Sequence, residues 1–572
     1  MAFGVVDFIV FSLIIIISSA IGIYYRFTGG KQKTTQEYMM GNQNQSIIPV
    51  AFSLLTMYTS STSLFGGSSE IYTHGTQFVI LYVGYIIGTP VIAYVFLPVF
   101  LKVGKLSVNE YLEKRFGSLT RTIISLSFSI QTIIYMGMML YAPALALETI
   151  VGLSLEFSIV LVGLVCIFYS TIGGIKAIIV TSMFQVIIIL GSILAVIAVA
   201  IYEAGSLSEI WNIAEKDGRI ELTNFNIDPI ERHSWFSLVS GGFFLFLLNN
   251  GINQAQVQKY LTMKNKTSAI KCVWLSLPIL LIISYTKCFT GLAIYSKYHN
   301  CDPVKSGRIT KDDQLLSLYV MDTMGNIPGM TGLFVAGVLS SGLSSVSPVI
   351  NSMAAISLED YIKPLVKNEL TDKKKVFYLK LLVVAYGIGF IILGFFIKYF
   401  GSLLQMSVVL ISVFGGPILA VFSLGMFVPY ANEKGTLTGL LIGLILSSII
   451  GFGGPKPPVK FLHRNTYGCS LFNQTVTTVL NSTLTNTNVR PDENYFYIYR
   501  ISYMYYISIG FFVTFITSLI ISAVFYNSNQ VIDLDLFTPL VQRILKKQRK
   551  HIKQDLQTLE LQKQKETFLC KN

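Results

Sequence analysis

Residues Ala336 to Ser352 read AGVLSSGLSSVSPVINS and place six serines inside an otherwise apolar stretch. In lipid a serine hydroxyl must find a hydrogen-bond partner, so such a helix either packs tightly on its neighbours or lines something polar. At helical spacing Ser341, Ser344 and Ser345 share one face. Neutral oxygens on one face can replace the lost waters of a small cation such as sodium. Close packing of small residues is the alternative explanation of the same pattern.

The rest of the chain has the composition of a polytopic membrane protein. Of its 572 residues, 52% are hydrophobic and 13% are charged, whereas about a quarter of a soluble domain is charged. We therefore expect an all-α protein with about 13 transmembrane helices. The apolar windows that predict them lie at approximately 5–25, 47–68, 77–99, 122–145, 157–175, 177–202, 235–252, 271–296, 330–356, 376–398, 401–427, 435–453 and 502–526.

The orientation follows from the basic residues beside the first window. That window lacks the basic start of a signal peptide and contains Asp7, and Arg26, Lys31 and Lys33 follow it. The positive-inside rule places these three residues in the cytoplasm. We expect a multi-pass plasma-membrane protein with an extracellular N-terminus and, after thirteen crossings, a cytoplasmic C-terminus. The net charge of +13 then reflects membrane topology, and we expect no nucleic-acid partner.

The longer outer segments carry covalent-modification signals. The loop at 454–501 contains glycosylation sequons at Asn473 and Asn481, which need lumenal exposure. Cys301 and Cys469 both fall in outer segments, where a disulfide can persist. They form either a disulfide or two separate thiols.

Enzyme chemistry has no support in the sequence. No His/Cys cluster has metal-ligand spacing, and there is no phosphate loop, no nucleophile–base pair and no soluble domain to hold one. We therefore expect a protein that is not an enzyme and has no cofactor. The basic tail is expected to be a solvated helix or a disordered tail at the anionic lipid surface.

Two spans are interrupted by polar and small residues. The second reads SLLTMYTSSTSLFGG (Ser53–Gly67) and the seventh FFLFLLNNGINQAQVQKY (Phe243–Tyr260). Such breaks free backbone carbonyls, which lipid tolerates only where they line a cavity or bind something. Each broken span heads a set of five, and an odd number of helices inverts the second set relative to the first. The expected divisions are a first helix in 1–30, repeats at 47–203 and 235–428, two further helices in 435–526, and a cytoplasmic tail at 527–572.

At these motifs the chain resembles the sodium:solute symporters, in the branch of sodium-coupled monocarboxylate, multivitamin and iodide transporters. The residues that carry the resemblance run in order from the second span to beyond the ninth. They are EIYTHGTQF (Glu70–Phe78), NEYLEKRFG (Asn109–Gly117), IYMGMMLYAPALALE (Ile134–Glu148), STIGGIKAIIVT (Ser170–Thr181), NQAQVQKYL (Asn253–Leu261), CDP (Cys301–Pro303) and LSSVSPVINSMAAISLEDYIKP (Leu343–Pro364).

The resemblance implies a LeuT-type fold with sodium, the coupling ion, held between the second and ninth spans. The implied ligands are the backbone carbonyls of Thr56, Thr59 and Ser341 and the hydroxyls of Ser344 and Ser345. Relatives that couple a second sodium usually have an aspartate in the sixth span, where this chain has Ser182. A hydroxyl neutralises a cation far less well than a carboxylate, so we expect one sodium per substrate.

The resemblance also implies a substrate pocket beside the sodium. The implied lining residues are Tyr58, Ser63, Tyr82, Phe246, Asn249 and Asn250. A pocket without acidic groups suits an anion, and the carboxylate and aromatic gate of sugar carriers are missing. Lys287 in the eighth span is a possible counter-ion, although a lysine that snorkels to the outer interface is the favoured interpretation.

We therefore expect sodium-driven import of a small organic anion by alternating access, first of all a monocarboxylate such as lactate, pyruvate or a short fatty acid. Transport of biotin or pantothenate is the close second candidate, and iodide is the third. A non-transporting sensor or an ion channel on the same scaffold is the alternative from another class. Accumulation of substrate against its gradient would separate a coupled carrier from both of these.

Overall fold

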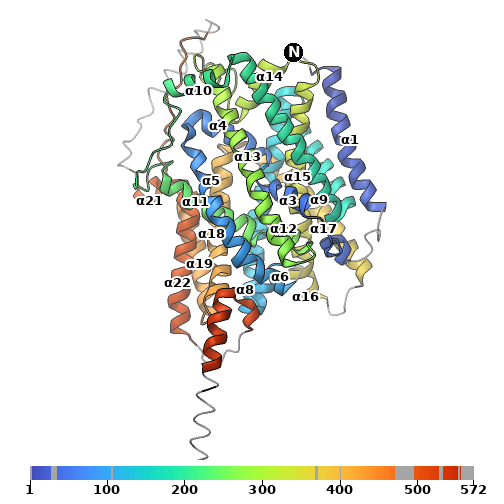
Figure 1. The fold of residues 1–572 in the computed structure, drawn as a ribbon, viewed down its shortest axis with the longest axis vertical. Coiled ribbons are helices and arrows are strands. Elements are labelled where there is room, and N and C mark those ends of the chain that lie inside the picture. Colours follow the sequence, from blue (N-terminus) through green and yellow to red (C-terminus); the bar gives the residue numbers. More distant parts are fainter. Residues whose placement is uncertain are drawn as a thin grey trace, which may run out of the picture.

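The computed structural model describes residues 3–27, 35–104, 107–366, 371–399, 401–469, 495–526, 533–551 and 554. Its long helices run side by side through one bundle (Figure 1). They are α1 (Val5–Phe27), α3 (Ile47–Leu54), α4 (Ser61–His74), α5 (Leu81–Val91), α8 (Ser118–Ala146), α9 (Leu155–Ala204), α11 (Trp235–Leu247), α13 (Lys266–Tyr298), α15 (Met330–Ile356), α17 (Asp372–Phe396), α18 (Leu403–Phe427), α19 (Glu433–Phe452) and α22 (Tyr506–Val524).

Shorter helices connect and continue the long ones. The α-helical ones are α2 (Thr35–Met40), α6 (Leu97–Val103), α7 (Glu110–Arg115), α10 (Leu207–Lys216), α12 (Gln254–Leu261), α14 (Leu315–Met324), α16 (Lys363–Leu365) and α21 (Tyr497–Arg500). The 3₁₀ and π segments are η1 (Gly41–Gln43), η2 (Leu55–Met57), η3 (Thr76–Ile80), η4 (Ile92–Phe96), η5 (Leu147–Val151), η6 (Leu248–Ile252), η7 (Asp312–Gln314), η8 (Ser357–Ile362), η9 (Ile397–Tyr399), η11 (Tyr503–Tyr505) and η12 (Leu534–Leu536).

The helices confirm an all-α polytopic membrane protein. Among the described residues, 11 helices are long and apolar enough to span a membrane, or 12 if the bent pair Ile47–Met57 and Ser61–His74 forms one span. The sequence predicted thirteen. The difference falls on the fifth window, where the described residues show the shorter apolar helix Leu155–Phe168. Gly174, with φ 59°, then separates this segment from the next span.

The second span is broken where its polar run begins. Its two halves are bent by 58°. Ser60 is extended, with φ −67° and ψ 152°, and its side chain accepts the backbone N–H of Ser63 to start α4. Serine suits this position because its short hydroxyl replaces the missing helical partner of a first-turn N–H. The run of serines and threonines therefore ends one helix and starts the next.

The seventh span is broken in the same manner. Its helix α11 passes into a π-helical turn, η6, and Asn253 is extended with φ −66° and ψ 125°. The Asn253 side chain accepts the N–H of Ala255 at 2.9 Å and so begins α12. Both predicted helix breaks are therefore present.

The serine-rich helix α15 lies at the centre of the bundle. Its apolar window is 94% buried inside the protein. A Cβ added to Gly337 would lie 2.3 Å from the hydroxyl of Ser192 on α9, and one added to Gly342 would lie 2.7 Å from Pro143 on α8. Close helix packing therefore explains the glycines in Ala336–Ser352, Gly337 and Gly342, rather than its serines.

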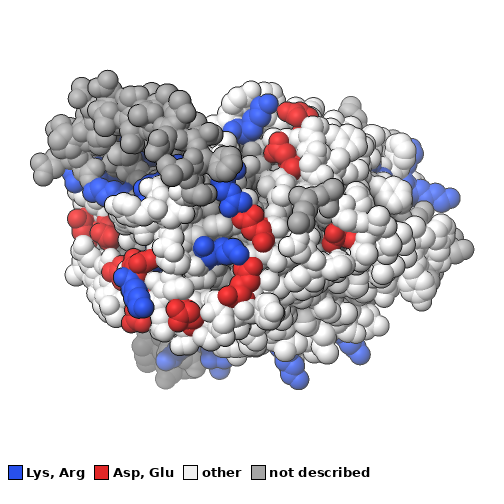
Figure 2. Space-filling view, turned by 90° about the horizontal axis from the view of Figure 1, so that it is seen from above, with Lys and Arg blue, Asp and Glu red and all other residues white. Residues whose placement is uncertain are grey.

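One end of the bundle carries α10, α14 and the first described residues, and we call it the upper end (Figure 1). At this end Cys301 and Cys469 form a disulfide with a Cα–Cα distance of 5.0 Å. Seen from above, acidic and basic side chains lie close together on this face (Figure 2). Asn473 and Asn481, the predicted glycosylation sites, lie outside the described residues.

Candidate functional site

The serine face of α15 meets the break of the second span through Ser345. Its hydroxyl lies 2.8 Å from the carbonyl oxygen of Thr56 and 2.9 Å from that of Ser341. The Ser344 hydroxyl lies 3.1 Å from the same Ser341 carbonyl. All four residues are buried. Four of the five residues predicted to bind sodium are thus joined by hydrogen bonds, and they present two carbonyl and two hydroxyl oxygens.

The fifth residue, Thr59, is also buried but contacts its own segment. Its hydroxyl donates to the carbonyl of Leu55 at 3.1 Å. In the described chain no recorded hydrogen bond joins Thr59 to α15. The structure therefore places Thr59 in the helix break, bonded within its own segment through both its hydroxyl and its backbone N–H.

Lys259 on α12 was missed by the sequence analysis. Its side chain is fully buried, and its ammonium donates to the carbonyl of Ser53 and, at 3.0 Å, to the hydroxyl of Thr56. The ammonium therefore ties the second half of one broken span to the first half of the other. Its position shortly after the polar break of the seventh span could have indicated this role.

The predicted substrate residues on the two broken spans contact one another. Tyr58 receives a hydrogen bond from the side-chain amide of Asn250. The Tyr58 ring lies 5.3 Å from that of Tyr85 and 5.9 Å from that of Phe246. Gln256 donates to the Asn250 side-chain oxygen at 3.1 Å and so fixes the amide's orientation. These contacts form an aromatic wall with one oriented amide.

Two further candidates lie around this wall. Tyr82 is buried, with ring centroids 5.4 Å from Tyr85 and 5.8 Å from Tyr285. Asn249 lies in the π-turn η6 and is only partly buried. The void beside Tyr58 holds about 10 Å³, which is room for about one water molecule. A larger ligand therefore requires the two breaks to move apart.

Lys287 corrects an expectation. The favoured interpretation was a lysine that snorkels to the outer interface, but its side chain is only 4% exposed. Its ammonium donates to the carbonyl of Tyr58 at 2.7 Å and to the hydroxyl of Ser63 at 3.0 Å. No ion pair is recorded for Lys287 among the described residues. The helix break freed a carbonyl that attracts the ammonium inward, and this contact outweighs the pull of the interface.

A network of charged groups lies above this site, at the end of α4. The Glu70 carboxylate lies 2.8 Å from the guanidinium of Arg232 and 3.2 Å from His233. The hydroxyl of Tyr503 also reaches it, at 3.4 Å. Burial lowers the pKa of His233, although the Glu70 carboxylate opposes the shift. This network joins the broken span to the segments that precede α11 and α22.

Ser182, the position of the missing aspartate, is buried within α9. It therefore lies inside the protein, where a carboxylate in its place would be able to neutralise an internal cation. The structure records no ion pair at Ser182 among the described residues.

The chain is similar to known transporters along most of its length. The pattern of the "Sodium:solute symporter family" matches residues 38–443. The chain is 44% identical to the "Putative sodium-dependent multivitamin transporter" of Drosophila melanogaster, covering 96% of this chain and 93% of that protein. It is 37% identical to the human "Sodium-coupled monocarboxylate transporter 1", covering 91% and 87%.

The fold is also that of a known symporter. A solved structure of a Na⁺-coupled sialic acid symporter superposes with a TM-score of 0.74 at 21% identity, covering 92% of this chain and all of that one. This likeness identifies the LeuT-type fold that the sequence predicted. With the family pattern, the relatives and the fold in agreement, the chain belongs to the sodium:solute symporter family, in its branch of sodium-coupled monocarboxylate and multivitamin transporters.

Proposed function

We propose that this sodium-coupled symporter imports a small organic anion with a single carboxylate, and a monocarboxylate is the first candidate. The observation that supports an anion is Lys287. Its buried ammonium, on α13, contacts the broken second span at the carbonyl of Tyr58. Among the described residues no carboxylate forms an ion pair with it. A positive charge in an apolar interior is costly without a counter-charge. A substrate carboxylate would supply that charge.

Sodium would couple to this step through the second span. We infer that it binds among the oxygens of Thr56, Ser341, Ser344 and Ser345, with Thr59 as the fifth ligand. A cation there fixes the break and therefore the position of Tyr58 and its neighbours. Each ligand then raises the affinity of the other, because such coupling is reciprocal. Rocking of the broken spans against the remaining helices would expose the site alternately to the two sides.

The proposal also covers the number of sodium ions per substrate and the orientation of the protein in the membrane. With Ser182 in place of a carboxylate, we propose one sodium per substrate, so transport of a monovalent anion moves no net charge. The upper end would be extracellular, since its disulfide between Cys301 and Cys469 suits an oxidising compartment. The site would therefore load from the upper end and release its ligands below.

Biotin or pantothenate is a second candidate substrate. The 44% identity to a relative named as a multivitamin transporter favours it. Both vitamins are carboxylates at neutral pH, so they would use Lys287 in the same manner as lactate. The size of the pocket once the breaks move apart would decide between the two classes.

A panel of uptake measurements tests the proposal. Purified protein in liposomes is given labelled lactate, pyruvate, butyrate, biotin, pantothenate or iodide, with and without an inward sodium gradient. We expect at least one carboxylate to accumulate above its outside concentration only with sodium. Accumulation of iodide alone would contradict the assignment of a carboxylate. Equilibration without accumulation would indicate a channel, and no uptake of any anion would indicate a sensor.

A further inference from the structure

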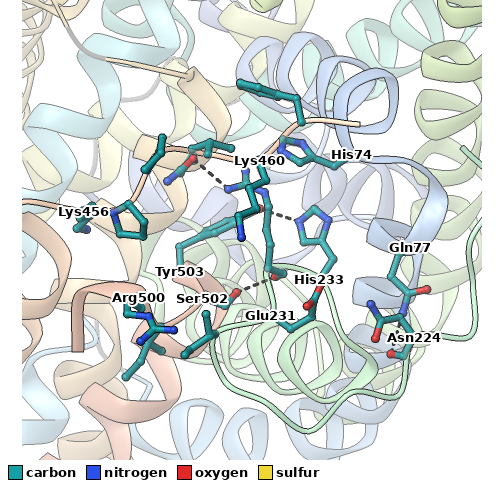
Figure 3. Close-up of a pocket in the computed structure, with 18 of the residues that line it drawn as sticks. His74, Gln77, Asn224, Glu231, His233, Lys456, Lys460, Arg500, Ser502 and Tyr503 are labelled. Carbon is teal, nitrogen blue, oxygen red and sulfur yellow. Dashed lines mark hydrogen bonds between the residues drawn. The ribbon is translucent and has the colours of Figure 1, made fainter. Parts of the chain in front are cut away.

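The upper end holds a cavity of about 390 Å³ that does not include the helix break beside Tyr58. Protein sites for small molecules usually measure about 300–1,000 Å³. Its wall comes from five parts of the chain: the end of α4 with η3, the segment before α11, Gln405 of α18, residues 456–462, and residues 499–506 (Figure 3). None of these lining residues belongs to the predicted sodium or substrate set.

Three polar atoms on this wall are buried without a hydrogen-bond partner in the described chain. They are His74 Nε2, Gln77 Oε1 and Arg500 Nε. The side chain of His74 is 8% exposed and Gln77 is 2% exposed. Buried polar groups in proteins nearly always have a partner, so three on one cavity wall indicate a ligand with polar groups of its own.

The free nitrogen of His74 is an acceptor in the neutral ring. The other nitrogen, Nδ1, lies 2.7 Å from the Thr73 hydroxyl and 3.4 Å from the Glu70 carboxylate. The Thr73 hydroxyl already donates to the carbonyl of Ser69 at 2.8 Å, so it accepts from His74. The ring proton is therefore on Nδ1, and Nε2 carries a lone pair without a partner in the described chain.

Gln77 supplies a second acceptor and Arg500 a cation. The Gln77 amide nitrogen donates to the carbonyl of Asn224 at 3.2 Å, and its oxygen has no partner in the described chain. Figure 3 shows Gln77 on one side of the cavity and Arg500 with Lys456 on the other. The cavity thus offers positive charge on one side and hydrogen-bond acceptors on the other. Glu231 also lines the cavity. Its negative charge repels an anion, so an anion is favoured only near Arg500.

We propose that this cavity is an outer binding site for a carboxylate that also carries an O–H or N–H donor. The carboxylate would pair with Arg500, and the donor would reach Gln77 or His74. Lactate, pantothenate and biotin have this combination of groups, whereas butyrate and pyruvate lack the donor. The inference rests on the proposed function, because the ligand would be the transported anion on its way to the helix break.

Equilibrium binding to the full-length protein in lipid nanodiscs tests the outer site. The probes are labelled pantothenate and labelled butyrate, both without sodium, because the outer site contains none of the sodium ligands. We expect pantothenate to bind and to bind about tenfold more weakly to Arg500→Gln, since a charge-assisted hydrogen bond is lost. Arg500→Lys, which keeps the charge, should restore part of the affinity. Arg308→Gln, at an exposed arginine paired with Asp322, is the matched control and should bind as the unmodified protein does.

A second variant keeps the test valid if the Arg500→Gln protein does not fold. Gln77→Met removes an acceptor but no charge, so it should weaken pantothenate binding and leave butyrate binding unchanged. Equal pantothenate binding by the unmodified protein, Arg500→Gln and Gln77→Met would overturn the outer site. This result would leave the proposed function standing. The proposed function itself would fail if the protein did not accumulate any carboxylate in liposomes with sodium.

Discussion

At the scale of single residues, Ser345 is the point where the two elements of the proposed sodium site touch. Its hydroxyl contacts the carbonyls of Thr56 and Ser341 at once. Ser345→Ala should raise the sodium concentration for half-maximal uptake about tenfold, because loss of one such oxygen costs about 1–2 kcal/mol. Ser352→Ala is the control, as the hydroxyl of this buried serine donates to the carbonyl of Val349 within the same helix. Sodium activation that is identical in both variants would remove Ser345 from the site.

Lys287 is the second residue whose role can be isolated. Lys287→Met keeps the length of the side chain and removes its charge, so sodium-driven uptake of a carboxylate should fall at least tenfold. Lys287→Arg should retain more uptake, because the positive charge beside Tyr58 remains. Melting temperatures of both variants show whether folding is preserved. If folded Lys287→Met transports at the normal rate, the lysine serves only the helix break.

At the scale of elements, α18 begins on a buried carboxylate. Asp313 accepts the backbone N–H of Leu403 at 3.1 Å. Burial raises its pKa from 3.8 to about 6, with Asp312 adding to the shift and the Leu403 N–H opposing it. Because folding raises this pKa, the protonated Asp313 side chain favours the folded state. Its contribution to the free energy of unfolding is fully present below pH 3.8 and is lost as the pH rises through 6.

Asp313→Asn therefore gives a pH-dependent prediction. The amide keeps an acceptor for Leu403 and removes the buried charge. Between pH 5 and pH 7.5 the stability of the variant should rise by about 1.4 kcal/mol relative to that of the unmodified protein, which is one pKa unit of buried-charge cost. Thermal melts of both proteins at the two pH values measure this. A stability difference that does not change with pH would show that folding leaves the pKa of Asp313 unshifted.

At the scale of the whole molecule, the disulfide joins segments 168 residues apart. Cross-linking so long a loop restricts the unfolded chain by about 4–5 kcal/mol in the loop-entropy model. A Cys301→Ser/Cys469→Ser double variant should therefore melt at a lower temperature. Reductant should destabilise the unmodified protein and leave the double variant unchanged. The double variant keeps the buried free cysteines Cys166, Cys272 and Cys288. It therefore shows whether reductant acts on the protein in any way other than through the disulfide.

Much of the molecule could be predicted from local sequence. Hydropathy located every helix that crosses the bundle, because a span must bury about 20 apolar residues whatever its neighbours are. The two helix breaks were predicted from Ser53–Gly67 and Asn249–Asn253, since polar runs end helices through short-range hydrogen bonds. The fifth window is the one predicted span that the described residues show only as a shorter apolar helix, Leu155–Phe168.

Three-dimensional contacts decided what the sequence left open. The sequence alone determined a membrane protein with oxygen-rich breaks and a serine face on Ala336–Ser352. Only the tertiary structure placed Ser345 on Thr56, brought Lys259 and Lys287 onto the freed carbonyls, and gathered His74, Gln77 and Arg500 around one cavity. These partners are far apart in the chain. Hydropathy and helix capping act within a few residues, whereas the partner of a buried charge is fixed by how whole helices pack.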